Sequence, residues 1–283
     1  MAKTKKEIEE DLKLIDVVIE ILDSRIPISS QNPDIAELVK NHKKIIVLNK
    51  TDLADSKQNE LWKEYFESKG QIAILTDCNT GKGINDVIKA IQDSMKNEIK
   101  EFSEKGRNGR KIRVMVLGIP NVGKSSFINR IAKSNRLEVA NKPGVTRKKQ
   151  WININDKINL LDTPGVLWPK FQDEKVALNL AFTGTIKDDV LEQVEVAFQL
   201  LKFLLENYRE NIIQRYELTE KYIQDTLNQE QAENVNIYEI MTEIGRKRGA
   251  IISGGNVDDE KVAKILLSDF RNGKLGRITI EKI

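Results

Sequence analysis

The chain of 283 residues contains a single cysteine, Cys78, so no disulfide can form within it and a reducing compartment is expected. No stretch is long and apolar enough to span a bilayer, and the first residues run into charged sequence without the apolar core of a signal peptide. The formal net charge is only +3, so the charge of the whole chain does not indicate a nucleic-acid partner. These absences predict a cytoplasmic protein with no membrane partner.

The first half of the chain has the pattern of an α/β domain. Hydrophobic residues make up 40% of the sequence, which is enough to form cores. Short apolar runs alternate with helical patterns, as is typical of a mostly parallel sheet with helices on both faces. Strands are expected at 17–22, 44–48, 71–75 and 112–117, with a hairpin at 151–154 and 157–161. Helices are expected at 5–15, 33–41, 57–69, 84–100 and 124–133.

Strand signals mostly stop after Pro169, and helical periodicity continues to the end of the chain. These later helices are expected at 173–183, 188–207, 219–230, 236–248 and 258–271. Residues 101–111 are polar and contain glycine, which favours a linker. We therefore predict an α/β domain over residues 1–172 and an all-helical domain over residues 173–283.

Residues 118–125 (Gly-Ile-Pro-Asn-Val-Gly-Lys-Ser) match the phosphate-loop pattern between a predicted strand and a predicted helix. The glycines let backbone N–H groups converge on phosphate oxygens at the start of the helix. Lys124 is expected to neutralise the β- and γ-phosphates, and the Ser125 hydroxyl to bind Mg²⁺. The residues of this loop predicted to bind nucleotide are Asn121, Val122, Gly123, Lys124, Ser125 and Ser126.

Residues 49–52 (Asn-Lys-Thr-Asp) follow a predicted strand and are typical of guanine recognition. Asp52 can accept hydrogen bonds from the ring N–H and the exocyclic amino group of guanine, and adenine lacks that amino group. A site built around such a carboxylate rejects the analogue by roughly 10⁴-fold or more. Asn49 is expected to hold the loop, and the stem of Lys50 to cover the base. Asp77 and Cys78 lie in the next loop, where a backbone N–H would meet guanine O6.

Residues 162–165 (Asp-Thr-Pro-Gly) resemble the second switch of GTPases, in which Asp162 would hold Mg²⁺ through water and the Gly165 N–H would sense the γ-phosphate. Thr146 is the candidate for the first switch threonine on Mg²⁺. The predicted catalytic set is therefore Lys124, Thr146 and Gly165. Val166 stands where many GTPases carry the glutamine that orients the attacking water, so we expect slow intrinsic hydrolysis and activation by another molecule.

The guanine motif precedes the phosphate loop, whereas in ordinary GTPases it follows. In this rotated order the sequence resembles the circularly permuted GTPases, and most closely the ribosome biogenesis GTPase A family. The resemblance covers nearly the whole chain, including residues 23–27 (Asp-Ser-Arg-Ile-Pro), 167–170 (Leu-Trp-Pro-Lys) and 245–249 (Gly-Arg-Lys-Arg-Gly). It implies a circularly permuted P-loop GTPase domain with GTP, GDP and Mg²⁺ as ligands, followed by a helical domain that binds rRNA. It also implies a cytoplasmic assembly factor for the large ribosomal subunit, which we expect to be monomeric.

Three sets of residues leave two interpretations open. Asn121 would bind K⁺ by family resemblance, or would satisfy its own turn. The basic run 147–149 would contact RNA, or would be a solvated loop face. Five cationic residues are predicted to bind RNA, although compensation of a helix dipole is the alternative for the first three: Arg246, Lys247, Arg248, Lys274 and Arg277.

The water-positioning group is the main departure from the family. Relatives carry a Trp-Phe-Pro-Gly-His segment before the Met-Ala-Lys at which this sequence begins, and its histidine is implied to replace the missing glutamine. The only histidine here, His42, is expected to be exposed at a helix end. Either the sequence starts late or hydrolysis proceeds by other means. The sequence therefore leaves two functions open. The first is a GTP hydrolase whose cycle times its binding to a pre-ribosomal particle. The second is a GTP-dependent RNA-docking module with negligible turnover.

Overall fold

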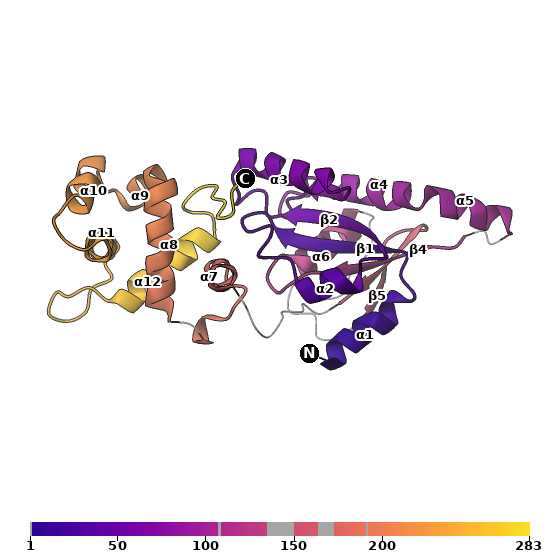
Figure 1. Cartoon of the computed structure of the whole chain (residues 1–283), viewed down its shortest axis with the longest axis horizontal. Helices are drawn as coiled ribbons and strands as arrows, with labels where there is room; N and C mark the ends of the chain where they lie inside the picture. Colours follow the sequence, from indigo (N-terminus) through magenta and orange to yellow (C-terminus); the bar gives the residue numbers. More distant parts are fainter. Residues whose placement is uncertain (1, 107–108, 135–149, 164–172, 191) are drawn as a thin grey trace. The chain divides into compact units, whose positions relative to one another are not determined.

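The computed structural model describes the chain except for residues 1, 107–108, 135–149, 164–172 and 191 (Figure 1). The chain divides into two compact units, Met1–Gln172 together with Thr279–Ile283, and Asp173–Ile278. The last five residues were expected in the helical domain. They belong instead to the first unit, because their hydrogen bonds are made to residues of that unit, such as Arg25.

The first unit is built on a six-stranded sheet in the order β3-β2-β1-β4-β6-β5, in which only β5 is antiparallel. The strands are β1 (Val17–Asp23), β2 (Lys43–Asn49), β3 (Ile72–Leu75), β4 (Ile112–Leu117), β5 (Gln150–Asn153) and β6 (Ile158–Asp162). The predicted α/β class is confirmed. Residues of β1 are buried throughout, because this central strand is covered on both faces.

The helices of this unit are α1 (Ala2–Leu12), α2 (Pro33–Leu38), α3 (Ser56–Ser68), α4 (Ile84–Ser94), α5 (Lys96–Glu104) and α6 (Lys124–Ser134). The single helix predicted at 84–100 is wrong, because α4 ends at Ser94 and Met95, which caps both helices, separates it from α5. The linker predicted from residue 101 is wrong over 101–104, which continue α5 since no glycine or proline occurs before Gly106.

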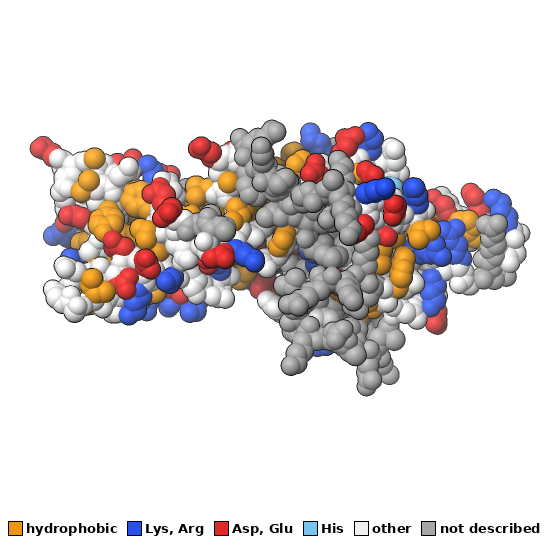
Figure 2. All heavy atoms as spheres, turned by 90° about the horizontal axis from the view of Figure 1, so that it is seen from below, with side chains coloured by type: hydrophobic (Ala, Val, Ile, Leu, Met, Phe, Trp, Pro, Cys, Tyr) orange, Lys and Arg blue, Asp and Glu red, His pale blue; other side chains and the backbone are white. Residues whose placement is uncertain are grey.

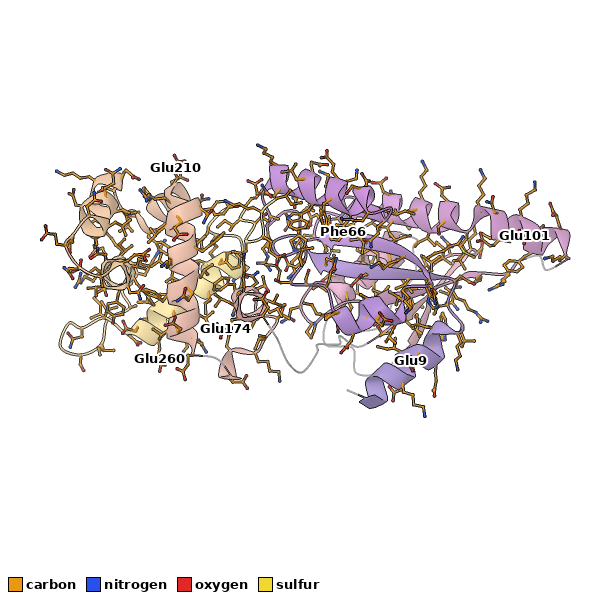
Figure 3. The ribbon with its side chains drawn as sticks, in the orientation of Figure 1. Glu9, Phe66, Glu101, Glu174, Glu210 and Glu260 are labelled. Atoms are coloured by element: carbon orange, nitrogen blue, oxygen red, sulfur yellow. The ribbon has the colours of Figure 1, made fainter. Side chains whose placement is uncertain are left out.

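Two apolar clusters lie on one face of the sheet. The first joins α1 and α2 to β1 and β4 through residues such as Ile8, Ile35 and Met115. The second joins α3 to β1 and β2, with Phe66 lying over the strands (Figure 3). Because α1 to α3 cover this face and crossovers are right-handed, the connections through α4 to α6 run over the other face. No described helix is long and apolar enough to cross a membrane.

The second unit is helical in its described residues. It comprises a short 3₁₀ helix, η1 (Asp188–Val190), and the helices α7 (Glu174–Phe182), α8 (Gln193–Asn207), α9 (Arg209–Tyr216), α10 (Glu220–Leu227), α11 (Glu233–Lys247) and α12 (Asp259–Arg271). The helix predicted at 188–207 begins only at Gln193. The helix α9, which was not predicted, follows α8 after one non-helical residue, Tyr208 (φ −143°).

Candidate functional site

The predicted nucleotide motifs meet at one edge of the sheet. Asp23, Asn49, Leu75, Leu117 and Asp162 end five parallel strands, so the loops that follow them lie along the same edge. The strand order changes direction between β1 and β4. In open α/β sheets ligands bind outside the carboxyl ends of the strands at such a point. This topology brings together the guanine motif, the phosphate loop and Asp162.

The phosphate loop needs its two glycines for conformation and space. Gly118 has φ +153°, and a Cβ there would lie 2.7 Å from the carbonyl oxygen of Ile21. Gly123 has φ +97°, and a Cβ there would collide with the side-chain amide of Asn49. The α6 helix starts at the next residue, so its free N-terminal N–H groups face the loop. Ser125 is half-buried and Ser126 is exposed in this first turn.

Lys124 is held as a buried cation at this loop. Its side chain donates to the carbonyl oxygens of Gly118 (3.0 Å) and Ile119 (2.9 Å). Burial lowers the pKa of Lys124 to about 8, although the nearby Asp162 carboxylate opposes the shift. An ammonium group desolvated in this way gains strongly from an anionic ligand such as a phosphate.

Asn49 joins the guanine motif to the phosphate loop. Its buried amide donates to the carbonyl oxygen of Val122 (2.8 Å), and its amide oxygen accepts from the Thr76 hydroxyl (3.2 Å). The Cys78 thiol donates to the same oxygen (3.0 Å). Burial raises the pKa of Cys78 to about 12, so this thiol acts as a hydrogen-bond donor rather than a nucleophile.

Asp52 is oriented by a residue that the sequence analysis did not select, Asn79. The Asn79 amide donates to Asp52 Oδ2 (3.0 Å), while its backbone N–H donates to Asp77 (2.7 Å). Arg130 of α6 fixes the same loop by donating to the carbonyl oxygens of Cys78 (2.8 Å) and Asn79. The helix that follows the phosphate loop therefore also supports the loop that orients the carboxylate of Asp52.

Lys50 is held by a partly buried ion pair with a carboxylate of the neighbouring strand. Its ammonium lies 2.9 Å from Asp23 Oδ2, and Arg25 binds the same carboxylate through Nε (2.9 Å) and a terminal guanidinium nitrogen (2.8 Å). Burial would raise the pKa of Asp23, but Arg25 and Lys50 hold it well below its usual range. Lys50 has φ +63°, a strained conformation that such contacts maintain.

The described oxygen donors suit Mg²⁺. Ser125 begins α6 after β4, and the buried Asp162 ends the neighbouring strand β6. A hydroxyl and a carboxylate are the hard ligands that Mg²⁺ uses together with substrate phosphates. In the described part of the chain no group of three or more His, Cys, Asp or Glu side chains could hold a metal without such phosphates. Thr146, Gly165, Val166 and the basic run 147–149 lie outside the described residues.

His42 is not the exposed residue that the sequence predicted. It is half-buried, and its Nε2 lies 3.1 Å from the carbonyl oxygen of Leu12 at the end of α1. The expectation was wrong because α1 packs against the segment that precedes β2. His42 precedes the first residue of β2, Lys43, and so lies at the opposite end of that strand from the guanine motif.

The predicted RNA-binding cations belong to the second unit and differ in their contacts. Arg246 pairs with Glu243 (3.2 Å), and Lys274 lies 3.4 Å from Asp269. Arg248 is half-buried, and its guanidinium lies 5.2 Å from the ring centroid of Tyr216. Two of the five are exposed and make no ion pair within the described residues, Lys247 and Arg277.

The comparisons with known proteins cover the whole chain. Residues 113–239 match a family of proteins described as 50S ribosome-binding GTPase. The ribosome biogenesis GTPase A of Bacillus pumilus is 43% identical over 282 residues, which cover 100% of this chain and 96% of that protein. The chain belongs to the ribosome biogenesis GTPase A family. It is therefore a GTPase.

Two further similarities support this assignment to the ribosome biogenesis GTPase A family. The mitochondrial ribosome-associated GTPase 1 of Bos taurus is 30% identical over 298 residues, covering 100% of this chain and 86% of that protein. The crystal structure of GNP-bound YlqF from T. maritima has a TM-score of 0.65 and 25% sequence identity, and covers 99% of this chain and 98% of that one. The circularly permuted fold predicted from the motif order is thereby confirmed.

The lowered pKa of Lys124 predicts that nucleotide affinity depends on pH. If Lys124 binds the phosphates of a nucleotide as predicted, those phosphates should stabilise the ammonium form and raise this pKa from about 8. Affinity should stay constant below pH 8 and weaken above it, by about tenfold at pH 9, because binding then takes up a proton.

Titration calorimetry with GDP between about pH 7 and about pH 9 measures this change. The variant His42→Asn is the control, because it removes the only histidine and should leave the profile unchanged. An affinity that is constant over the whole range would contradict the assignment of this lysine.

Proposed function

We propose that this GTPase binds GTP and Mg²⁺ at the carboxyl edge of its sheet and that its nucleotide state controls its binding to a precursor of the large ribosomal subunit. The observation that carries the proposal is the meeting of the motifs: Asn49 contacts the phosphate loop directly, and Lys124 and Asp162 lie beside each other. The names of the relatives, which include ribosome biogenesis GTPase A, support the ribosomal partner. We also propose that it acts in the cytoplasm as a monomer.

A second candidate is a GTP-dependent RNA-docking module with negligible turnover of its own. Val166 favours it, because a valine side chain cannot orient the attacking water. Single-turnover hydrolysis of GTP, measured with and without large ribosomal subunits, separates the two. A rate that rises with added subunits supports the hydrolase cycle, and an unchanged, negligible rate supports the docking module.

The RNA contact is proposed in the helical unit. Acidic and basic side chains are interspersed over the face of this unit drawn in Figure 2, so phosphate binding there depends on individual cations rather than on a broad basic surface. Lys247 lies in the last turn of α11, and Arg277 follows the glycine turn at Gly276. These two have the fewest competing partners among the predicted residues.

The paired reversal Lys247→Glu with Arg277→Glu should therefore weaken binding to the ribosomal particle. Each phosphate contact removed lowers the slope of log affinity against log salt concentration by about 0.9 or less. Sedimentation with large-subunit particles over a series of salt concentrations measures both effects. Arg248→Glu should also disturb the packing on Tyr216, so it is a poor probe of RNA contact.

The control for the reversal is Lys264→Glu, which changes an exposed cation of α12 that pairs with Glu260 within its own helix. Its particle binding and salt dependence should match the parent protein. If the paired reversal leaves the slope unchanged, the RNA contact lies elsewhere, in the basic run 147–149 or the linker.

The second cation, K⁺, is proposed at Asn121. This residue is exposed in the phosphate loop and has φ +64°, a conformation that asparagine tolerates better than most residues. Hydrolysis should be faster in K⁺ than in Na⁺, and Asn121→Ala should remove the difference. Equal rates for the parent protein in the two salts, at one ionic strength, would show that the side chain only serves its turn.

A further inference from the structure

Residues 279–283, here called the returning segment, follow the helical unit and pack on the first unit beside the guanine motif. The carboxylate of Glu281 accepts from the backbone N–H of Ile28 (2.6 Å) and of Ser29 (3.0 Å), and from the Ser29 hydroxyl. The indole N–H of Trp62 donates to the backbone carbonyl oxygen of Glu281 (2.8 Å). One side chain thus satisfies three donors of a loop about 250 positions earlier in the sequence.

The same segment also bonds to the two backbone stretches that flank the guanine-binding residues. The Ile280 N–H donates to the carbonyl oxygen of Arg25 (2.8 Å), in the loop after β1. The Thr279 hydroxyl, which is fully buried, accepts from the N–H of Asp55 (3.0 Å). Asp55 caps the N-terminus of α3 only three residues after Asp52.

These contacts lead directly to the groups that would touch the base. Arg25, held by Ile280 at its carbonyl oxygen, binds the carboxylate of Asp23, and Asp23 binds the ammonium of Lys50. Lys50 occupies a strained conformation, so the ion pair that holds it contributes to its position. The segment therefore supports the guanine loop on both sides, through Lys50 and through Asp55.

We propose that the returning segment is a positioning element for guanine recognition and that Glu281 is its principal residue. The proposal rests on the nucleotide site proposed above. Its hydrogen bonds to Arg25 and Asp55 flank the loop that carries Lys50 and Asp52, so the segment acts by holding that loop. The segment follows Ile278, the last residue of the helical unit, along the chain, and its contacts with the guanine loop are hydrogen bonds.

A purely structural role makes a different prediction. If the segment only fastens the fold, its loss should lower thermal stability and affect nucleotide binding no more than other equally destabilising changes. If it positions Lys50, its loss should speed the release of guanine nucleotide specifically, and Lys50 should be needed for that effect. The kinetics of GDP release distinguish the two.

The test compares the release of a fluorescent GDP from the full-length parent, Glu281→Ala and Ile8→Ala. Ile8 is buried in the cluster under α1, away from the guanine motif, so it provides a matched loss of stability. Glu281→Ala should release GDP about tenfold faster, since bonds to a charged acceptor are among the stronger ones. Ile8→Ala, compared at equal thermal stability, should release GDP at the parental rate.

A double variant tests the route through Lys50. In a Lys50→Met background, Glu281→Ala should change GDP release by less than about twofold, since coupled residues are not additive. Parental release from Glu281→Ala, an equal rise in Ile8→Ala, or full additivity with Lys50→Met would each overturn the proposal. The variant Lys124→Ala tests the proposed nucleotide site separately from the role of the returning segment. If GDP binds Lys124→Ala with parental affinity, the proposed nucleotide site is wrong.

Discussion

Replacing Lys124 by alanine should reduce the affinity for GTP and GDP by at least about 100-fold, the largest effect expected in the phosphate loop. The ammonium is already buried and held by two backbone carbonyl oxygens, so most of its desolvation precedes ligand binding. Its attraction to the phosphates therefore contributes to affinity with little further cost. Without it, the site loses the cation that offsets both the phosphates and the nearby carboxylate of Asp162, and Mg²⁺ alone would have to compensate them.

Titration calorimetry with GDP measures this loss, and Lys133→Ala is the matched control. Lys133 lies in the last turn of the same helix, α6, and is exposed, so it tests whether any loss of a cation from the helix has the same effect. The control should bind like the parent protein. An unchanged affinity in Lys124→Ala would mean that the loop is a structural turn before a helix.

Replacing Asp52 by asparagine should weaken guanine nucleotides by roughly 10²- to 10⁴-fold, because the amide can no longer accept both hydrogen bonds from the base. The geometry also predicts a gain for xanthine nucleotides, which carry a carbonyl oxygen in place of the exocyclic amino group. The new side chain could keep its oxygen toward the amide of Asn79 and turn its NH₂ group toward xanthine.

Competition between GTP, XTP and ATP for the parent, for Asp52→Asn and for Glu60→Gln measures this change. Glu60 is exposed on α3, close in sequence to the guanine motif, so its neutralisation controls for loss of one negative charge. The parent should bind ATP far more weakly than GTP. If the parent protein binds ATP as tightly as GTP, Asp52 is not the residue that selects guanine over adenine.

The sequence alone could predict the sheet and the strand ends, because its motifs follow apolar runs whose lengths fit buried strands. Asn49, Asp52, Lys124 and Asp162 were selected for this reason, and the topology places the loops that carry them along one edge. Asn79 and Arg130 could not be selected in the same way. Their contacts depend on how the β3–α4 loop meets α6, and no local pattern encodes a pairing across about 50 residues.

The errors in the helical parts have a similar origin. Met95 separates α4 from α5, and Tyr208 separates α8 from α9. Neither residue is a glycine or a proline, so helix propensity does not predict that the helix is interrupted there. The returning segment was missed because its residues carry no strand or helix pattern, and Glu281 is an ordinary acidic residue in the sequence. Its role follows only from the folded structure, in which the backbone N–H groups of Ile28 and Ser29 donate to its carboxylate.

Co-sedimentation with large-subunit precursor particles tests whether the nucleotide state governs binding to the ribosomal precursor. The parent protein, loaded with a non-hydrolysable GTP analogue, should sediment with the particles in a larger fraction than when it is loaded with GDP. Lys124→Ala should show no such difference, because it cannot hold either nucleotide. Equal binding of the parent protein in the two nucleotide states would contradict nucleotide control of particle binding.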